Sequence, residues 1–254
     1  MMLSEKEMIE INKSGWNTVA HQFFEGSFND LKYGSYGPLE SDQNLLGEIR
    51  DKTILEVGCG SGHTLEYFAN RGAKELWGID LSSEQIKTAK KVVSRFDIPI
   101  TLIESPMEDI QGLPIDYFDI AISIYALGWT VNLEKTLINV YKSLNPGGVF
   151  VFTWEHPIHS ILEYADGKLY FRLSYLSEQY EKQESWRKVP IVMNYRRLST
   201  YINGLIQTGF VIDKVIEEVR IPDDDNSIPE KWYSAEKARI IPPSFTIRCH
   251  KPLF

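Results

Sequence analysis

Short apolar segments alternate with helical segments through the middle of the chain. Helical patterns begin at Gly62 and cover 82–96 and 133–144, and the apolar, β-branched runs around them lie at 53–57, 76–80, 100–104, 118–124 and 147–154. Strands separated by roughly ten to fifteen helical residues are typical of right-handed crossovers in a parallel sheet covered on both faces. The pattern therefore predicts an α/β fold with a doubly wound sheet.

A different pattern precedes this alternation. Residues 4–25 predict an amphipathic helix that opens with Ser4 and Glu7 in capping-box spacing. A loop rich in glycine and tyrosine follows, and then a short helix at 43–49.

Beyond the fifth strand the rhythm is interrupted. Residues 157–190 are aromatic and charged without a clean period, and we expect a hairpin or a short strand pair here. A helix at 195–208 closed by Gly209, a strand within 210–221 and a last strand at 243–251 restore the pattern.

Composition and charge narrow the class of protein. With 254 residues, 43% hydrophobic and 24% charged, the chain is expected to form one domain, 1–254, around one substantial core. Within it we predict an N-terminal helical lid region at 1–50 and an inserted substrate-cap segment at 157–192. A net charge of −8 argues against a nucleic-acid partner, because phosphate binding depends on lysine and arginine displacing counterions. The acidic loop at 222–232 is interpreted as a solvated connection without a function.

The cysteines and the N-terminus bear on location. Cys59 and Cys249 are too few for a disulfide framework or a metal cluster, so we expect no bound metal and a reducing cytoplasm. The N-terminal segment lacks the apolar core of a signal peptide, and no apolar run approaches the roughly 18 residues of a membrane span. The sequence predicts a soluble cytoplasmic protein without a membrane partner.

The stretch TILEVGCGSGHTLEYFA, residues 53–69, carries the strongest chemical signal. Gly58, Gly60 and Gly62 stand between a strand and a helix, where bare backbone allows a tight turn, close approach of a ligand and free amides at the helix start. Asp80 ends the second strand about 20 residues later, the spacing at which an acid meets a ribose diol. It is equally suited to capping the following helix, and the two roles are compatible.

Several motifs together resemble the class I S-adenosylmethionine-dependent methyltransferases, in particular the methyltransferase type 11/25 group. These motifs are ILEVGCGSG, GIDLS, MEDIQGLP followed by FDIAIS, and LNPGGVFVF, and the resemblance spans about 51–154. It implies a Rossmann-like, seven-stranded sheet in the order 3-2-1-4-5-7-6 with the seventh strand antiparallel and an insertion after strand five. It also implies S-adenosyl-L-methionine as cofactor and methyl transfer to an oxygen, nitrogen or carbon atom of a small-molecule acceptor.

The resemblance assigns roles to the first two strand ends. Glu56 would hold the amino-acid end of the cofactor, and Gly58 and Gly60 would let the cofactor pass over the turn. Asp80 would accept hydrogen bonds from both ribose hydroxyls, with Leu81 packing on the adenine.

The third and fourth strand ends complete the implied site, with two departures from the family pattern. Met107 would offer its backbone amide to the adenine, but Pro106 replaces the usual aspartate, so a carbonyl or Glu108 must substitute for that side chain. After strand four, Gly128 stands where many relatives carry a histidine, and no catalytic role of that histidine can be transferred. The methionine side would be lined by Ser123, Ile124 and Tyr125.

Candidate catalytic groups follow strand five. Methyl transfer from a sulfonium consumes charge, so alignment, desolvation and a deprotonated acceptor supply most of the acceleration. A hydroxyl or protonated-amine acceptor needs a general base within hydrogen-bond reach. His156 and His159 are the leading candidates and Glu155 is a third, while each histidine also suits a purely structural role.

Aromatic residues suggest a lid and a substrate wall. We expect four aromatic residues to close over the cofactor and exclude water: Tyr33, Tyr36, Trp16 and Phe23. Tyr33 is also counted among the cofactor contacts. The alternative is a helix packed on the sheet edge. The aromatic residues of the insertion suit either a wall for a planar or apolar substrate or a homodimer surface: Tyr164, Tyr170, Phe171, Tyr175, Tyr180 and Trp186.

Two rival functions fit part of the pattern. An NAD(P)-dependent oxidoreductase would also use a glycine-rich turn and Asp80, although Glu56 and the GCGSG spacing argue against it. A non-catalytic S-adenosylmethionine-binding protein would explain Pro106 and Gly128.

Overall fold

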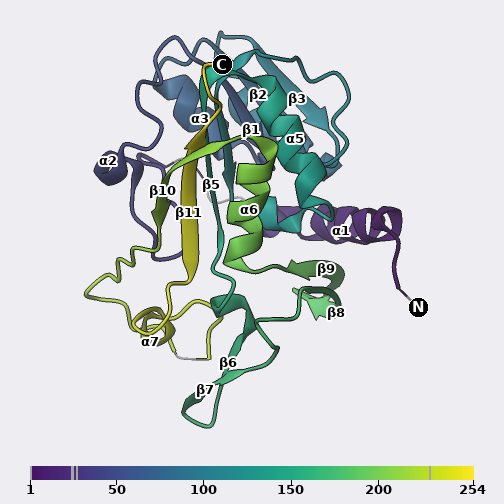
Figure 1. The fold of residues 1–254 in the computed structure, drawn as a ribbon, viewed down its shortest axis with the longest axis vertical. Coiled ribbons are helices and arrows are strands. Elements are labelled where there is room, and N and C mark those ends of the chain that lie inside the picture. The colour runs from purple at the N-terminus through teal and green to yellow at the C-terminus, as the bar shows by residue number, and fades with distance from the viewer. Residues whose placement is uncertain (1, 24–25, 27, 229) are drawn as a thin grey trace.

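A single seven-stranded sheet forms the centre of the molecule (Figure 1). The computed structural model describes residues 2–23, 26, 28–228 and 230–254. The sheet has the order β10-β11-β5-β4-β1-β2-β3, and β11 runs antiparallel to both of its neighbours while the remaining neighbours pair in parallel. The strands are β1 (Thr53–Val57), β2 (Glu75–Asp80), β3 (Ile100–Glu104), β4 (Phe118–Ile124), β5 (Leu144–Glu155), β10 (Val211–Ile216) and β11 (Ser244–His250). Because β10 and β11 are the sixth and seventh strands of this sheet along the chain, the predicted order and the antiparallel last strand are confirmed.

Helices cover both faces of the sheet, as the alternating pattern predicted. α3 (His63–Asn70) and α4 (Ser83–Val93) pack in one hydrophobic cluster, and α5 (Leu133–Ser143) and α6 (Leu198–Thr208) pack in the other. Strand β5 shows why both clusters form: Phe150 and Phe152 point into one, and Val151 between them points into the other. Successive strand residues face opposite sides, so a run of apolar residues fills two cores.

The N-terminal helix is confirmed, with a change near its end. α1 (Glu5–Val19) opens with the predicted capping box, in which Ser4 and Glu7 satisfy each other's backbone amides, and it continues as a 3-10 turn, η1 (Ala20–Phe23). Residues 24–25 of the predicted helix lie outside the described residues. No helix in the described part of the chain is long and apolar enough to cross a membrane.

The predicted helix at 43–49 is wrong. A single turn, α2 (Glu40–Gln43), ends instead at Asn44, whose φ of 46° lies in the left-handed region. The buried Glu40 carboxylate then accepts the backbone amides of Leu45 and Leu46, each at 2.9 Å. A side chain that satisfies these amides replaces the helical hydrogen bonds, so the chain continues as an irregular segment.

The insertion after β5 forms two hairpins. β6 (Leu162–Ala165) pairs with β7 (Lys168–Phe171), and β8 (Gln179–Trp186) pairs with β9 (Val189–Tyr195). The second hairpin lies beside α1 (Figure 1), where the side chain of Asn12 exchanges two hydrogen bonds with the backbone of Val192, at 3.1 and 2.7 Å. Because Tyr195 completes β9, α6 begins three residues later than predicted. Helix α1 and the β8–β9 hairpin therefore meet over the same edge of the sheet.

Candidate cofactor and acceptor site

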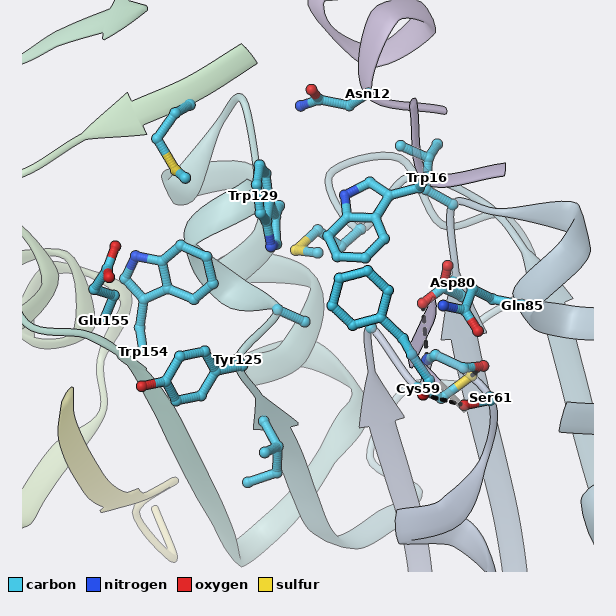
Figure 2. A pocket seen from close by; sticks show the side chains of 18 of the residues that line it. Asn12, Trp16, Cys59, Ser61, Asp80, Gln85, Tyr125, Trp129, Trp154 and Glu155 are labelled. Atoms are coloured by element: carbon cyan, nitrogen blue, oxygen red, sulfur yellow. Dashed lines mark hydrogen bonds between the residues drawn. The ribbon is translucent and has the colours of Figure 1, made fainter. Parts of the chain in front are cut away.

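A cavity of about 780 Å³ lies beyond the carboxyl ends of β1, β2 and β4. In open α/β sheets ligands bind at this edge. Figure 2 shows Asp80 and Cys59 at one end of the cavity, Trp154 and Glu155 at the other, and Trp16 and Trp129 between them. The first group belongs to the glycine turn and β2, so we call this part the turn end and the opposite part, around Trp154 and Glu155, the aromatic end.

Two glycines of the turn are required for different reasons. Gly60 has a φ of +50°, and a Cβ there would meet nothing within 4 Å, so its bare backbone faces the cavity. Gly58 has a φ of +78°, and a Cβ there would lie 2.1 Å from the Cβ of Ala126. Gly60 therefore leaves room for a ligand, whereas Gly58 leaves room for the loop after β4.

Asp80 connects the turn to the helix that follows β2. One carboxylate oxygen accepts the amide of Gly60 and the other accepts the amide of Ser82, each at 2.8 Å. Burial raises the pKa of Asp80 to about 6, against the lowering effect of these two amides. A carboxylate has about four acceptor sites, so the helix-capping role leaves further sites for a ligand.

Two further acceptor oxygens at the turn end are buried without a partner in the described part of the chain: Oε2 of Glu56 and Oε1 of Gln85. Burial raises the pKa of Glu56 well above its usual range, with a lowering hydrogen bond from Thr64 and a further raising effect of Asp80. Unpartnered buried acceptors are costly unless a ligand donates to them. Gln85 was missed by the sequence analysis, although it lies in the first turn of α4, five residues after Asp80.

Most other predicted cofactor residues also line the cavity, namely Leu81, Met107, Glu108, Ile124 and Tyr125. Glu108 already accepts the amide of Val131 at 2.8 Å, and burial raises its pKa. Tyr125 adopts a φ of 53°, an unfavourable conformation for a bulky residue that is typical of functional sites.

Three predicted residues lie elsewhere. Ser123 donates to the carbonyl oxygen of Val57 at 2.8 Å and so joins β4 to β1. The Tyr33 hydroxyl donates to Glu40 at 2.6 Å within the core, and the Tyr36 hydroxyl donates to Asp225 at 2.6 Å. Of the expected lid residues, Trp16 and Phe23 line the cavity.

The departure at Gly128 has a packing explanation. A Cβ at this position would lie 1.7 Å from Cε2 of Trp154, so the indole occupies the volume that a side chain would need. Pro106, the other departure, lines the cavity without a side-chain donor or acceptor.

The three candidate catalytic groups differ in whether they reach the cavity. The His156 ring lies 2.8 Å from Glu217 through Nε2, and burial lowers its pKa. The buried His159 ring stacks on Tyr233, with centroids 5.4 Å apart, and its Nδ1 lies 3.3 Å from Glu155. Glu155 is the one of the three that lines the cavity.

The loop at 222–232, to which the sequence analysis assigned no function, contributes to this site. Trp232 at its end and the adjacent Tyr233 both line the cavity, and the Trp232 indole N–H donates to Glu155. Tyr233 meets Tyr125 edge to face, with centroids 6.1 Å apart. The mixed aromatic and acidic composition of this loop did not reveal whether it forms a wall of the cavity or a solvated connection.

The insertion contributes other residues than expected. Among its six predicted wall residues only Trp186 lines the cavity, while Tyr170 and Phe171 are exposed. Five unpredicted residues replace them: Arg172, Gln183, Arg187, Met193 and Tyr195. Strand alternation in two separate hairpins decides which side chains face inward, and a segment without a clear period did not reveal it.

Comparisons with known proteins agree with this geometry. The family model described as a methyltransferase domain matches residues 55–152. An uncharacterized protein of Haemophilus influenzae is 30% identical over 185 residues, covering 68% of this chain and 73% of that protein. The crystal structure of a candidate S-adenosylmethionine-dependent methyltransferase from Listeria monocytogenes is 27% identical, with a TM-score of 0.71 over 84% of this chain and 95% of that one.

A further match covers a smaller share of the chain. Protein arginine N-methyltransferase 1 of Dictyostelium discoideum is 40% identical over 106 residues, which are 39% of this chain and 30% of that protein. Since the match spans less than a third of that relative, it carries no information on the methyl acceptor of the present protein.

The sheet order, the glycine turn and the acid after β2 define a nucleoside-binding, Rossmann-like α/β protein. The chain belongs to the class I S-adenosylmethionine-dependent methyltransferases, and its cofactor is S-adenosyl-L-methionine.

Proposed function

We propose that this enzyme transfers a methyl group from S-adenosylmethionine to an oxygen, nitrogen or carbon atom of a small molecule held at the aromatic end of the cavity. The observation that carries the proposal is the continuity of one cavity of about 780 Å³ from the turn end to the aromatic end. A cofactor at the turn end and an acceptor at the aromatic end would then meet inside one continuous cavity.

The residues at the turn end fit the cofactor. Gly60 leaves open space, Asp80 has acceptor sites for a ribose diol, and the unpartnered oxygens of Glu56 and Gln85 suit donor groups of the ligand. When bound, S-adenosylmethionine supplies a methyl group activated by a sulfonium.

The chain's own residues would align the acceptor and exclude water. Trp16 and Trp186 bring α1 and the β8–β9 hairpin over the cavity. Tyr125 directly follows β4 and lies beside Trp154, with ring centroids 5.9 Å apart. Glu155 would take a proton from the acceptor, a role supported by its position in the cavity lining and by His159, whose Nδ1 lies 3.3 Å from it. Alignment in a dry site accounts for most of the rate that such a transfer requires.

A small acceptor is favoured over a macromolecule by the cover of this site. Helix α1 and the β8–β9 hairpin are joined by Asn12 and lie over the cavity. The net charge of −8 also disfavours nucleic acid. A cytoplasmic location stays a prediction, with which the two buried free thiols, Cys59 and Cys249, are consistent.

The experiment has two stages. Calorimetry should first show binding of S-adenosylhomocysteine, and Asp80→Ala should weaken it. Purified enzyme with methyl-labelled S-adenosylmethionine is then given phenols, amines, carboxylic acids and peptides. Label in a small molecule supports the proposal. Label in peptides alone would contradict it, and cofactor binding without transfer to any acceptor would favour a non-catalytic binding protein.

A further inference from the structure

Tryptophans gather in the middle of the cavity and at its aromatic end. Five of the six tryptophans in the chain line the cavity: Trp16, Trp129, Trp154, Trp186 and Trp232. Trp16, Trp129 and Trp186 come from three separate elements, and their ring centroids lie 5.2, 5.3 and 5.6 Å apart pairwise. The rings meet at steep angles of 88°, 60° and 66°, so they form the walls of a corner and not a stacked layer. Indole faces attract cations because of the ring quadrupole.

The protein already places one of its own cations on these rings. The Arg187 guanidinium lies 4.6 Å from the centroid of Phe23 and 5.6 Å from that of Trp186. Arg172, the other arginine of the cavity, is engaged by Glu181 at 2.9 Å and by the Tyr195 hydroxyl at 2.6 Å. Of these two lining arginines, Arg172 is thus paired with a carboxylate, whereas Arg187 contacts aromatic rings and the side chain of Gln22.

Glu155 adds a negative charge at the same end. It is the last residue of β5 and only 4% exposed, and Figure 2 shows its carboxylate beside Trp154. It takes hydrogen bonds from neutral donors, the Trp232 indole and the Tyr233 hydroxyl.

No lysine or arginine in the described chain forms an ion pair with Glu155. Lys237 lies over the Trp232 ring, with Nζ 5.5 Å from its centroid, and attracts Glu155 electrostatically without forming an ion pair, while His159 is cationic only when protonated. A buried carboxylate without a directly bonded cation is costly, and a cationic ligand would supply that contact.

We propose that the cavity binds an organic ammonium group between the indole rings in its middle and Glu155 at its aromatic end, so that the methyl acceptor is a small molecule carrying an amine. That the bound molecule is the methyl acceptor rests on the proposed function. Ammonium binding does not rest on it, because binding is measurable without methyl transfer. Trp16, Trp129 and Trp186 supply the ring faces and Glu155 supplies the counter-charge.

A matched pair of ligands tests this directly. Choline and 3,3-dimethylbutan-1-ol have the same shape and differ in the positive charge, so their affinities isolate the cation. With S-adenosylhomocysteine present to fill the turn end, calorimetry and tryptophan fluorescence should show choline binding about tenfold more tightly, as expected for a desolvated cation–π contact with a counter-ion. Equal affinities, or preference for the neutral alcohol, would overturn the proposal.

Variants locate the effect. Glu155→Gln and Trp129→Leu should each remove most of the preference for choline and leave binding of S-adenosylhomocysteine unchanged. Trp77→Phe is the control, because Trp77 packs against Phe118 and Tyr117 outside the cavity lining. If Glu155→Gln does not fold, the comparison of the two ligands on the unmodified enzyme still decides.

The two proposals fail differently. Cation preference in an enzyme that methylates nothing would refute the proposed function and leave the ammonium site standing. Methylation of neutral phenols without any preference for choline would do the reverse.

Discussion

The indole of Trp154 fills the volume beside Gly128, so that a Cβ at position 128 would lie within 1.7 to 2.3 Å of three of its ring atoms. Trp154 in turn meets Trp129 edge to face, with centroids 5.7 Å apart. The absence of a side chain at 128 is therefore linked to the aromatic wall of the cavity. A glycine that looked like a lost functional residue is a condition for placing Trp154.

Gly128→Ala should destabilise the protein. Overpacking a filled site typically costs about 1–3 kcal/mol in the free energy of unfolding. Trp154→Leu removes the clash, so the double variant should recover part of the loss and show a coupling of about 1 kcal/mol or more in a double-mutant cycle. Additive effects in urea unfolding would mean that the two residues do not compete for the same space.

Cofactor affinity should depend on pH through Asp80. Burial raises its pKa in the free protein to about 6, and ribose hydroxyls donate more strongly to the ionised than to the protonated carboxyl group, so binding lowers the pKa of Asp80. Affinity for adenosine should accordingly be constant above pH 7 and decline as the pH falls through about 6. Calorimetry between pH 5 and 8 measures this, with 2′,3′-dideoxyadenosine as the control ligand. An equal decline for the control would assign the titration to another group.

Removal of the same carboxylate tests its share of the affinity. Asp80→Ala should weaken S-adenosylhomocysteine binding by about 1–3 kcal/mol, since it removes a buried acceptor of ligand hydrogen bonds. It also removes the acceptor for the amides of Gly60 and Ser82, so thermal unfolding must be followed in parallel. Unchanged affinity in a folded variant would place the ribose elsewhere.

Substitutions at the two turn glycines should separate stability from binding. Gly60→Ala should weaken cofactor binding and cost only about 1–2 kcal/mol of stability, the penalty of a left-handed conformation. Gly58→Ala should cost more stability, because its Cβ meets Ala126, and Ala126→Gly should restore part of it. Equal losses of binding and stability in the two variants would contradict this division.

The junction of α1 with the second hairpin should control closure of the site. Asn12→Ala leaves the backbone of Val192 without its partner and should cost about 1–3 kcal/mol of local stability. Hydrogen exchange should speed up in β9 and α1, and acceptor KM should rise more than kcat falls. The exposed Glu10→Ala on the same helix is the control. Unchanged exchange would mean that other contacts hold the hairpin.

The two histidines should differ in their effect on catalysis. His156 is bonded to Glu217, so His156→Asn should lower stability and leave kcat unchanged. His159 lies behind Glu155, so His159→Asn should lower kcat and shift the pH profile of the rate. A loss of kcat in His156→Asn alone would restore His156 as the base.

Local sequence determined the sheet and the turn end of the cavity, because both depend on the hydrophobic periodicity and on short-range turns. Three local features were predicted, and each depends on residues close together in the chain: the alternation of strands and helices, the Ser4 capping box and the glycines before α3. Asp80 was identified by its position at the end of the second strand, about 20 residues after the glycine turn, and by the resemblance. The predicted helix at 43–49 does not form, because the buried carboxylate of Glu40 accepts the amides of Leu45 and Leu46.

Which residues form the walls in the middle and at the aromatic end of the cavity, by contrast, was decided mainly by tertiary structure. These walls come from α1, the loop after β4, the end of β5, the second hairpin and the segment around Trp232, which are far apart in the chain. Whether an aromatic residue of these segments faces the cavity depends on hairpin register and on contacts such as that of Asn12 with Val192. The sequence specifies which residues are available, but packing between distant segments selects Trp186 and Tyr233 for the site and turns Tyr33 and His156 away from it.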